Sequence, residues 1–207
     1  MEKVVITGAT GFIGTRLVKS LFANGFEIVP WHKKFETYDN VSRVYHLAAP
    51  SSNEFIQNNP KYVMDTIMDV TREALQISPT ALFINASSMG ALEIADTAQG
   101  AYNIAKRCME TYIKHSSVNF LNYRIPSVYG EGMHQDGFIA RCINKTAYEP
   151  TEPDRVYYIA HVDEVVDALV QLRPIDMEEI TLGQIYELFN SGRRGLYRPT
   201  SNKGIIR

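Results

Sequence analysis

A tyrosine and a lysine lie one helical turn apart in the middle of the chain, at Tyr102 and Lys106. Residues four apart on a helix share one face. A nearby ammonium stabilises a phenolate and lowers the tyrosine pKa toward working pH, so the two could form a proton-transfer pair. An isolated pair at this spacing is usually a surface contact, so its meaning depends on what precedes it.

Two hydroxyl groups, Ser87 and Ser88, follow an apolar run at residues 81–84 that is typical of a buried strand. Ligands of open α/β sheets bind at the carboxyl ends of the strands, where these hydroxyls would be well placed for chemistry. Serines are also common in ordinary turns. A functional role for the serines is supported by the order of the motifs along the chain. A glycine-rich turn comes first, then the serine pair, then the tyrosine and lysine, which is the order that a hydride-transfer site needs.

The glycine-rich turn consists of Gly8, Gly11 and Gly14, between an apolar strand at residues 4–6 and an amphipathic helix beginning near Phe12. A helix N-terminus offers unpaired N–H groups and partial positive charge, which suit a pyrophosphate. Glycine lets the phosphates approach the backbone and the helix approach the sheet. The spacing is not that of the commonest dinucleotide pattern, but the flanking strand and helix favour a nucleotide-binding turn over a plain one.

The residues after a second predicted strand, at 26–31, bear on the choice of cofactor. An acidic residue near this point commonly binds the adenosine ribose, but this chain has His32, Lys33 and Lys34. A basic cluster would suit a 2′-phosphate, which slightly favours NADP over NAD. A solvated loop with two lysines is an equally simple interpretation.

A third predicted strand, at 44–47, runs into Ala48 and Ala49, whose small side chains would let a cofactor lie against the backbone. Within it, His46 is expected to be a satisfied core histidine. The short loop before this strand leaves no room for the extra strand–helix unit of a doubly wound sheet. A core-packing helix is expected over residues 60–77.

These elements predict an α/β fold: a Rossmann-like doubly wound parallel sheet with a reduced C-terminal substrate lobe. The NAD(P)-binding domain would cover residues 1–130 and the lobe residues 131–207, interleaved as effectively one domain. The patterns in the lobe predict two helices and two strands: helix 136–147, strand 155–159, helix 163–172 and strand 183–189. The chain ends in a basic tail that could contact a diphosphate or be disordered, with arginines at positions 193, 194 and 198.

Composition excludes several classes of protein. Of the 207 residues 45% are hydrophobic, as in an ordinary globular protein, and a formal net charge of -2 gives no reason to expect nucleic acid or an anionic membrane as partner. No apolar run could span a bilayer, and no signal-peptide layout is present. Cys108 and Cys142 are far apart and expected to be free thiols, which fits a reduced, cytoplasmic setting. No metal site is expected.

Together these motifs resemble those of the extended short-chain dehydrogenase/reductase family, within its NAD(P)-dependent epimerase/dehydratase group acting on nucleotide-activated sugars. The resemblance covers residues 3–190. It is carried by TGATGFIG at 7–14, HLAA at 46–49, Ser88, Tyr102 with Lys106 and Glu110, a stretch at 123–130 similar to the family's R-x-x-x-V-Y-G, and HVDEV at 161–165.

The resemblance implies a role for each matching residue. Tyr102 would be the general acid/base, Lys106 would lower its pKa and bind the nicotinamide ribose, and Ser88 would hydrogen-bond the reacting oxygen, with Ser87 as the alternative. The glycines would hold the pyrophosphate. Further cofactor contacts are implied at Thr10, Phe12, Ile13, Leu47, Ala48, Ala49, Ala86, Ser87 and Ile125, together with His32 and Lys33.

The implied activity is NAD(P)-dependent hydride transfer at a hydroxyl or keto carbon of a nucleotide-linked sugar, as an epimerase or ketoreductase. Met89 and Gly90 follow Ser88, in place of the Asp-Glu pair of sugar 4,6-dehydratases, so dehydration is the least expected reaction. Family members commonly dimerise through the helices that correspond to 60–77 and 100–116, so a homodimer is expected. A reductase of small carbonyl compounds is a second hypothesis. A non-catalytic cofactor-sensing protein is a third, which the retained tyrosine and lysine disfavour.

Overall fold

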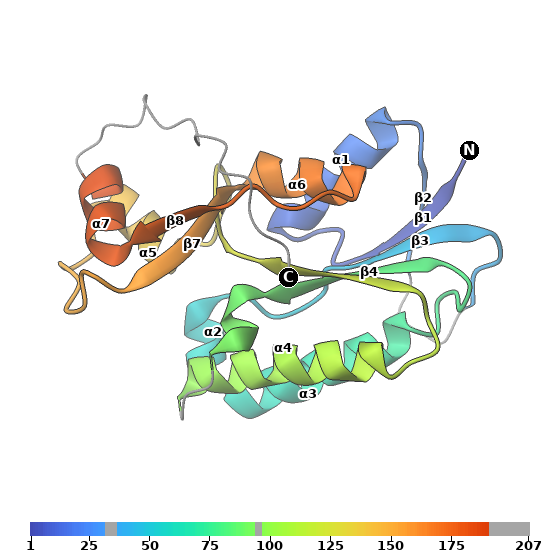
Figure 1. The fold of residues 1–207 in the computed structure, drawn as a ribbon, viewed down its shortest axis with the longest axis horizontal. Helices are drawn as coiled ribbons and strands as arrows, with labels where there is room; N and C mark the ends of the chain where they lie inside the picture. The colour runs from blue at the N-terminus through green and yellow to red at the C-terminus, as the bar shows by residue number, and fades with distance from the viewer. Residues whose placement is uncertain (32–36, 94–96, 191–207) are drawn as a thin grey trace. The chain divides into compact units, whose positions relative to one another are not determined.

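The computed structural model describes residues 1–31, 37–93 and 97–190. It forms two compact units, one from Met1 to Ile125 and a second that begins at Pro126. Each unit is described by itself (Figure 1). His32 and Lys33, and the basic tail, lie outside the described residues.

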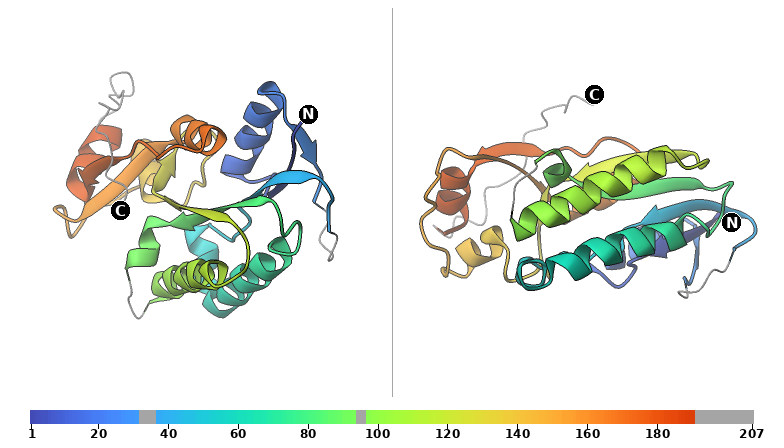
Figure 2. Two further views of the ribbon diagram at one scale, coloured as in Figure 1. Left: turned by 45° about the vertical axis from the view of Figure 1, so that its right-hand side comes forward. Right: turned by 90° about the horizontal axis from the view of Figure 1, so that it is seen from below.

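The first unit is built on a five-stranded parallel sheet with helices on both faces (Figures 1 and 2). Its spatial order is β2-β1-β3-β4-β5. The strands are β1 (Lys3–Thr7), β2 (Glu27–Val29), β3 (Val41–His46), β4 (Leu82–Ser88) and β5 (Phe120–Ile125). The helix α1 (Phe12–Ala23) covers one face, and α2 (Asn53–Asn58), α3 (Pro60–Ala74) and α4 (Ala98–Lys114) cover the other. A short 3-10 helix, η1 (Met89–Leu92), follows β4. The Rossmann-like fold predicted from the sequence is confirmed.

The sheet has fewer strands than a dinucleotide-binding fold, in which the usual strand order is 3-2-1-4-5-6. The edge strand β2 pairs with β1, and β1 pairs on its other side with β3. The chain passes from β2 to β3 through residues 30–40 alone. In the described part of this connection, residues 30–31 and 37–40, no strand or helix is present, as the sequence predicted.

One hydrophobic core of this unit lies between the sheet and the α3–α4 layer. Val5, Val44 and Phe83 on the strands pack with Ile67 of α3 and Met109 of α4, all of them buried. Burial on both faces explains why β1 reads as a continuous apolar run.

Two local signals begin the helices of this layer. Pro60 stands at the start of α3, where its fixed φ and missing N–H cost nothing. The hydroxyl of Thr97 accepts a hydrogen bond from the Gly100 N–H at 3.0 Å and caps α4, the helix that carries the tyrosine and lysine.

The second unit contains a small three-stranded sheet of order β6-β7-β8. β6 and β7 are parallel, and β7 and β8 are antiparallel. Its elements are β6 (Ser127–Tyr129), α5 (Phe138–Ile143), β7 (Val156–His161), α6 (Val162–Gln171), β8 (Glu178–Thr181) and α7 (Leu182–Asn190). Among the helices of the described chain, none has both the length and the hydrophobicity to cross a membrane.

The strand predicted over 183–189 is wrong, because these residues belong to the helix α7. The Thr181 hydroxyl accepts a hydrogen bond from the Gln184 N–H at 3.3 Å, and the Gln184 side chain accepts one from the Thr181 N–H at 2.9 Å. This reciprocal pair is a capping box, which starts a helix. Ile185, Leu188 and Phe189 then follow at helical spacing and pack against the core of the unit.

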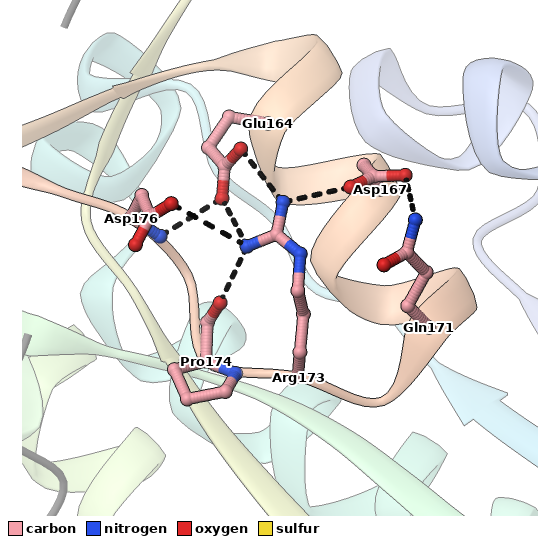
Figure 3. A network of polar contacts seen from close by, with 6 residues as sticks. All are labelled: Glu164, Asp167, Gln171, Arg173, Pro174 and Asp176. Atoms are coloured by element: carbon pink, nitrogen blue, oxygen red, sulfur yellow. Dashed lines mark hydrogen bonds and ion pairs between the residues drawn. The ribbon is translucent and has the colours of Figure 1, made fainter. Parts of the chain in front are cut away.

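The end of α6 is held by Arg173 (Figure 3). Its guanidinium donates two hydrogen bonds to the Glu164 carboxylate, at 2.7 and 2.9 Å, and one to Asp167 at 2.7 Å. The chain reverses just before it, at Leu172, whose φ is 54°. The bidentate pairing fixes the connection that leaves the helix.

Candidate active site

The predicted site residues gather at the carboxyl ends of four neighbouring strands of the first unit. Gly8 follows β1, Ala48 follows β3, and Ser88 and Ile125 form a register pair at the ends of β4 and β5. His32 and Lys33 cannot be added to this group, since they lie outside the described residues. The sheet edge where they gather is the one at which open α/β folds bind ligands.

Two glycines of the turn, Gly8 and Gly14, lie too close to neighbouring backbone for any other residue. Gly8 has a φ of +73°, and a Cβ there would lie 2.8 Å from the Ala48 nitrogen. A Cβ on Gly14 would overlap the carbonyl oxygen of Gly8. The Gly11 N–H closes the turn with a 3.0 Å hydrogen bond to that same carbonyl. The structure thus brings the ends of β1 and β3 into contact.

The helix α1 begins at this turn with an open N-terminus. Its N-cap residue, Gly11, has no side chain to cap the first N–H groups, and the first turn of the helix carries no acidic residue. Such an end attracts an anion through its N–H groups and its dipole. The turn therefore offers the backbone donors that an anion needs, and the binding of a pyrophosphate by Gly8, Gly11 and Gly14 stays a prediction.

His46 is a satisfied core histidine, as expected. Its Nδ1 lies 2.9 Å from the Thr7 hydroxyl and its Nε2 lies 3.0 Å from the Thr71 hydroxyl. Because Thr71 donates its proton to the Ile67 carbonyl, at 2.7 Å, Nε2 must carry the hydrogen, and Nδ1 accepts from Thr7. Burial, together with the charge of Lys106, lowers the pKa of His46 to about 3, so the ring is neutral.

Lys106 ties α4 to the end of β4. Its buried ammonium donates a hydrogen bond to the carbonyl oxygen of Ala86 at 2.9 Å. Burial lowers the pKa of Lys106 to about 8, and the negative charge of Glu110 acts in the opposite direction. The lysine is therefore fixed beside the serine pair.

Tyr102 lies beside Lys106, with the lysine Nζ 5.8 Å from the centre of its ring. The side chain is partly buried against the core. Burial raises the pKa of Tyr102 to about 12. The lowering expected from Lys106 is not the net direction of the shift, because desolvation of the phenol raises this pKa.

The segment after Ser88 packs on α4 next to Tyr102. The Ser88 hydroxyl accepts a hydrogen bond from the Gly90 N–H at 3.1 Å. A Cβ on Gly90 would lie 2.5 Å from the side-chain oxygen of Asn103, the residue after the tyrosine. The turn that holds the Ser88 hydroxyl is therefore packed against the part of α4 that carries Tyr102.

The sequence interpretation missed an ion pair behind the serines. Arg124 of β5 donates hydrogen bonds of 3.0 and 2.8 Å to the two carboxylate oxygens of Glu110. Ser87 donates to the same carboxylate at 2.5 Å. The spacing of Glu110 from Lys106 was visible in the sequence. The pairing with Arg124 was not, because it depends on how β5 and α4 pack.

A row of polar side chains crosses the sheet just behind this edge. Thr7 pairs in register with His46, His46 with Asn85, and Asn85 with Asn122. The Asn85 amide donates to the Asn122 side chain at 2.6 Å, and Asn122 in turn hydrogen-bonds Glu110. A polar residue at matching positions of apolar strands was the signal that could have revealed this row.

The model of the NAD dependent epimerase/dehydratase family matches residues 4–174. The chain belongs to this family. A curated member of related sequence, UDP-glucuronic acid decarboxylase 1 of Xenopus tropicalis, is 25% identical over 226 aligned positions, which cover 83% of this chain and 53% of that protein. The chain thus spans about half the length of this relative.

Solved structures of other proteins have a fold similar to that of this chain. The NAD-dependent NDP-hexosamine 5,6-dehydratase of tunicamycin biosynthesis superposes with a TM-score of 0.74 at 19% identity, over 94% of this chain and 82% of that one. The UDP-glucuronic acid 4-epimerase of Bacillus cereus, solved with UDP-glucuronic acid and NAD, gives a TM-score of 0.69 at 16% identity, over 91% and 82%.

Proposed function

We propose that the chain is an NAD(P)-dependent oxidoreductase that acts on a hydroxyl or keto carbon of a nucleotide-activated sugar, as an epimerase or a ketoreductase. The observation that carries the proposal is the hydrogen bond from Lys106 to Ala86, which sets the tyrosine helix on the sheet edge that holds the glycine turn. Family membership supports the cofactor, and the named substrates of the relatives support the sugar nucleotide.

In this mechanism each residue has a defined task. Tyr102 holds its proton at neutral pH and is suited to donate that proton to a ketone oxygen. In the reverse direction the phenolate form of Tyr102 would accept the proton of the hydroxyl. Lys106 supplies a fixed positive charge beside it. Of the two serines, Ser87 is engaged by Glu110, which favours Ser88 for the bond to the reacting oxygen. When bound, the nicotinamide supplies hydride transfer.

The cofactor would lie against the open start of α1, with Gly8, Gly11 and Gly14 at its pyrophosphate and Ala48 beneath it. The preference for NADP suggested by Lys33 remains a prediction. It is tested by comparing the dissociation constants of NADPH and NADH. The Lys33→Ala variant is expected to bind NADPH more weakly and NADH with unchanged affinity.

The acid/base assignment is tested by Tyr102→Phe. We expect loss of turnover by at least about 100-fold, the contribution of a positioned proton donor, with unchanged NADPH affinity measured by cofactor fluorescence. Tyr112→Phe is the matched control, since it removes a hydroxyl from an exposed tyrosine of the same helix. Equal activity of the two variants would contradict the assignment.

A second experiment separates the two reactions. Incubation with NADPH and candidate keto-sugar nucleotides should consume NADPH stoichiometrically if the enzyme is a reductase. An epimerase should convert the sugar while NADPH or NAD is retained without net change. Turnover of small ketones but of no sugar nucleotide would favour the small-carbonyl reductase instead.

We also propose that the protein is a homodimer through α3 and α4. Two of the apolar residues of α4, Met109 and Ile113, belong to the core, but Tyr112 of α4 and Tyr62 of α3 are 44% and 60% exposed. The helices lie side by side on one face (Figure 2).

A further inference from the structure

Glu110 lies one helical turn after Lys106, and three side chains from two strands hold its carboxylate. Ser87 on β4 and Arg124 on β5 donate to it, and Asn122 on β5 hydrogen-bonds it as well. The side chain is only 13% exposed. Although burial raises the pKa of Glu110, these hydrogen bonds outweigh burial and hold it below its usual range. The carboxylate is therefore charged at neutral pH, in one orientation.

The charged and titratable groups around Lys106 come from several elements. Tyr102 and Glu110 stand on its own helix, one turn before and one turn after. His46 approaches from β3 and is neutral, and the ring of Tyr102 is neutral at working pH. Arg124, from β5, is the ion-pair partner of the Glu110 carboxylate. Among these described groups, Glu110 is the anion, and its i, i+4 spacing sets it on the same face of α4 as the lysine.

A buried ammonium needs such an anion. Lys106 is 4% exposed, and desolvation favours its neutral form. The hydrogen bond to Ala86 satisfies one of its three donors. A backbone carbonyl contributes a dipole, whereas Glu110 contributes a full charge.

We propose that Glu110 is a positioning residue for Lys106: braced by Arg124 and Ser87, its carboxylate keeps the lysine charged at the end of β4, beside Tyr102. The catalytic use of a charged Lys106 rests on the proposed function, but the effect of Glu110 on the lysine charge does not. A neutral residue could brace α4 against β5 just as well, so the proposal turns on the charge.

The test measures the lysine directly and needs no substrate. The protein is labelled with ¹³C at the lysine ε-carbons, and the Lys106 resonance is assigned by its loss in Lys106→Met. Its titration is followed between pH 6 and 11. In Glu110→Gln, which keeps the side-chain shape without the charge, the titration midpoint should fall by about one pH unit.

Glu164→Gln is the matched control. Glu164 also pairs bidentately with an arginine, Arg173, and is similarly enclosed, with 19% of its side chain exposed (Figure 3). It stands on α6 in the second unit. Both variants should lower the melting temperature, but the control should leave the Lys106 midpoint unchanged.

Arg124→Gln gives a result of opposite sign, and it decides the question if Glu110→Gln fails to fold. Removing the guanidinium leaves the Glu110 charge less compensated, so the Lys106 midpoint should rise. A merely structural brace would leave the Lys106 midpoint of Arg124→Gln unchanged or lowered, and either result would overturn the proposal. Failure to bind NADH and NADPH would contradict the proposed function while leaving the titration result valid.

Discussion

The buried side chain of His46 makes the stability of the protein depend on pH. Its neutral ring is enclosed between two threonine hydroxyls. Because its pKa is lowered from 6.5 to about 3, the unfolded chain binds a proton in a pH range where the folded chain does not. The contribution of this residue to stability is therefore full above about pH 6.5 and is lost progressively as the pH falls toward 3.

We predict that this residue gives the protein a steep acid sensitivity. The free energy of unfolding should fall by up to about 1.4 kcal/mol per pH unit below pH 6.5 because of His46 alone. The slope is measured by urea unfolding at pH 6.5, 5.5 and 4.5. His46→Gln removes the titrating group and should flatten the slope by this amount. An unchanged slope in the variant would show that other groups cause the acid sensitivity.

At the residue scale, sequence reasoning was strongest where contacts are local. Tyr102 and Lys106 could be placed on one face because four residues make about one turn. The bond of Lys106 to Ala86 and the burial that raises the Tyr102 pKa depend on long-range packing, so the direction of that pKa shift was predicted wrongly. The Glu110–Arg124 pair was missed for the same reason.

The strand–turn–helix at the start of the chain provides a test at the scale of elements. Gly8 and Gly25 both have positive φ, at 73° and 83°, but a Cβ on Gly8 would strike Ala48, whereas a Cβ on Gly25 meets nothing within 4 Å. Both alanine variants should be destabilised by about 1–2 kcal/mol of backbone strain. In chemical denaturation, Gly8→Ala should lower the free energy of unfolding clearly more than Gly25→Ala, because the steric clash with Ala48 adds to the backbone strain.

The same two alanine variants also test cofactor binding. Gly8→Ala should also lose affinity for NADPH, while Gly25→Ala, at the far end of α1, should retain it. Equal stability and equal affinity in the two variants would mean that the turn can move away from Ala48 at no cost.

Element types were predictable where the pattern was long or bounded by clear signals. The parallel strands and the helices α3 and α4 follow from buried apolar runs and helical spacing. The last element was misread because residues 183–189 are too short for apolar spacing to separate strand from helix. The capping box of Thr181 and Gln184 carried the decisive information.

At the scale of the whole molecule, the proposed dimer makes a clear prediction. Sedimentation velocity should show a dimer for the natural chain, and Tyr112→Glu should shift it to the monomer by placing a charge in an apolar contact. Phe22→Glu is the control, since Phe22 is 73% exposed on α1, on the other face of the sheet. A monomer in the natural chain, or a dimer that Phe22→Glu alone disrupts, would contradict this interface.

The polar row behind the candidate site also restricts how the strands can assemble. Apolar strands of a parallel sheet could slide by two residues and still bury the same face. Here such a slide would set Thr7 opposite Val44 instead of His46, and each abandoned polar group in the interior would cost about 1–3 kcal/mol. Four neighbouring strands carry a member of the row, so every slipped arrangement is penalised at once. The row therefore selects a single alignment of the sheet while the protein folds.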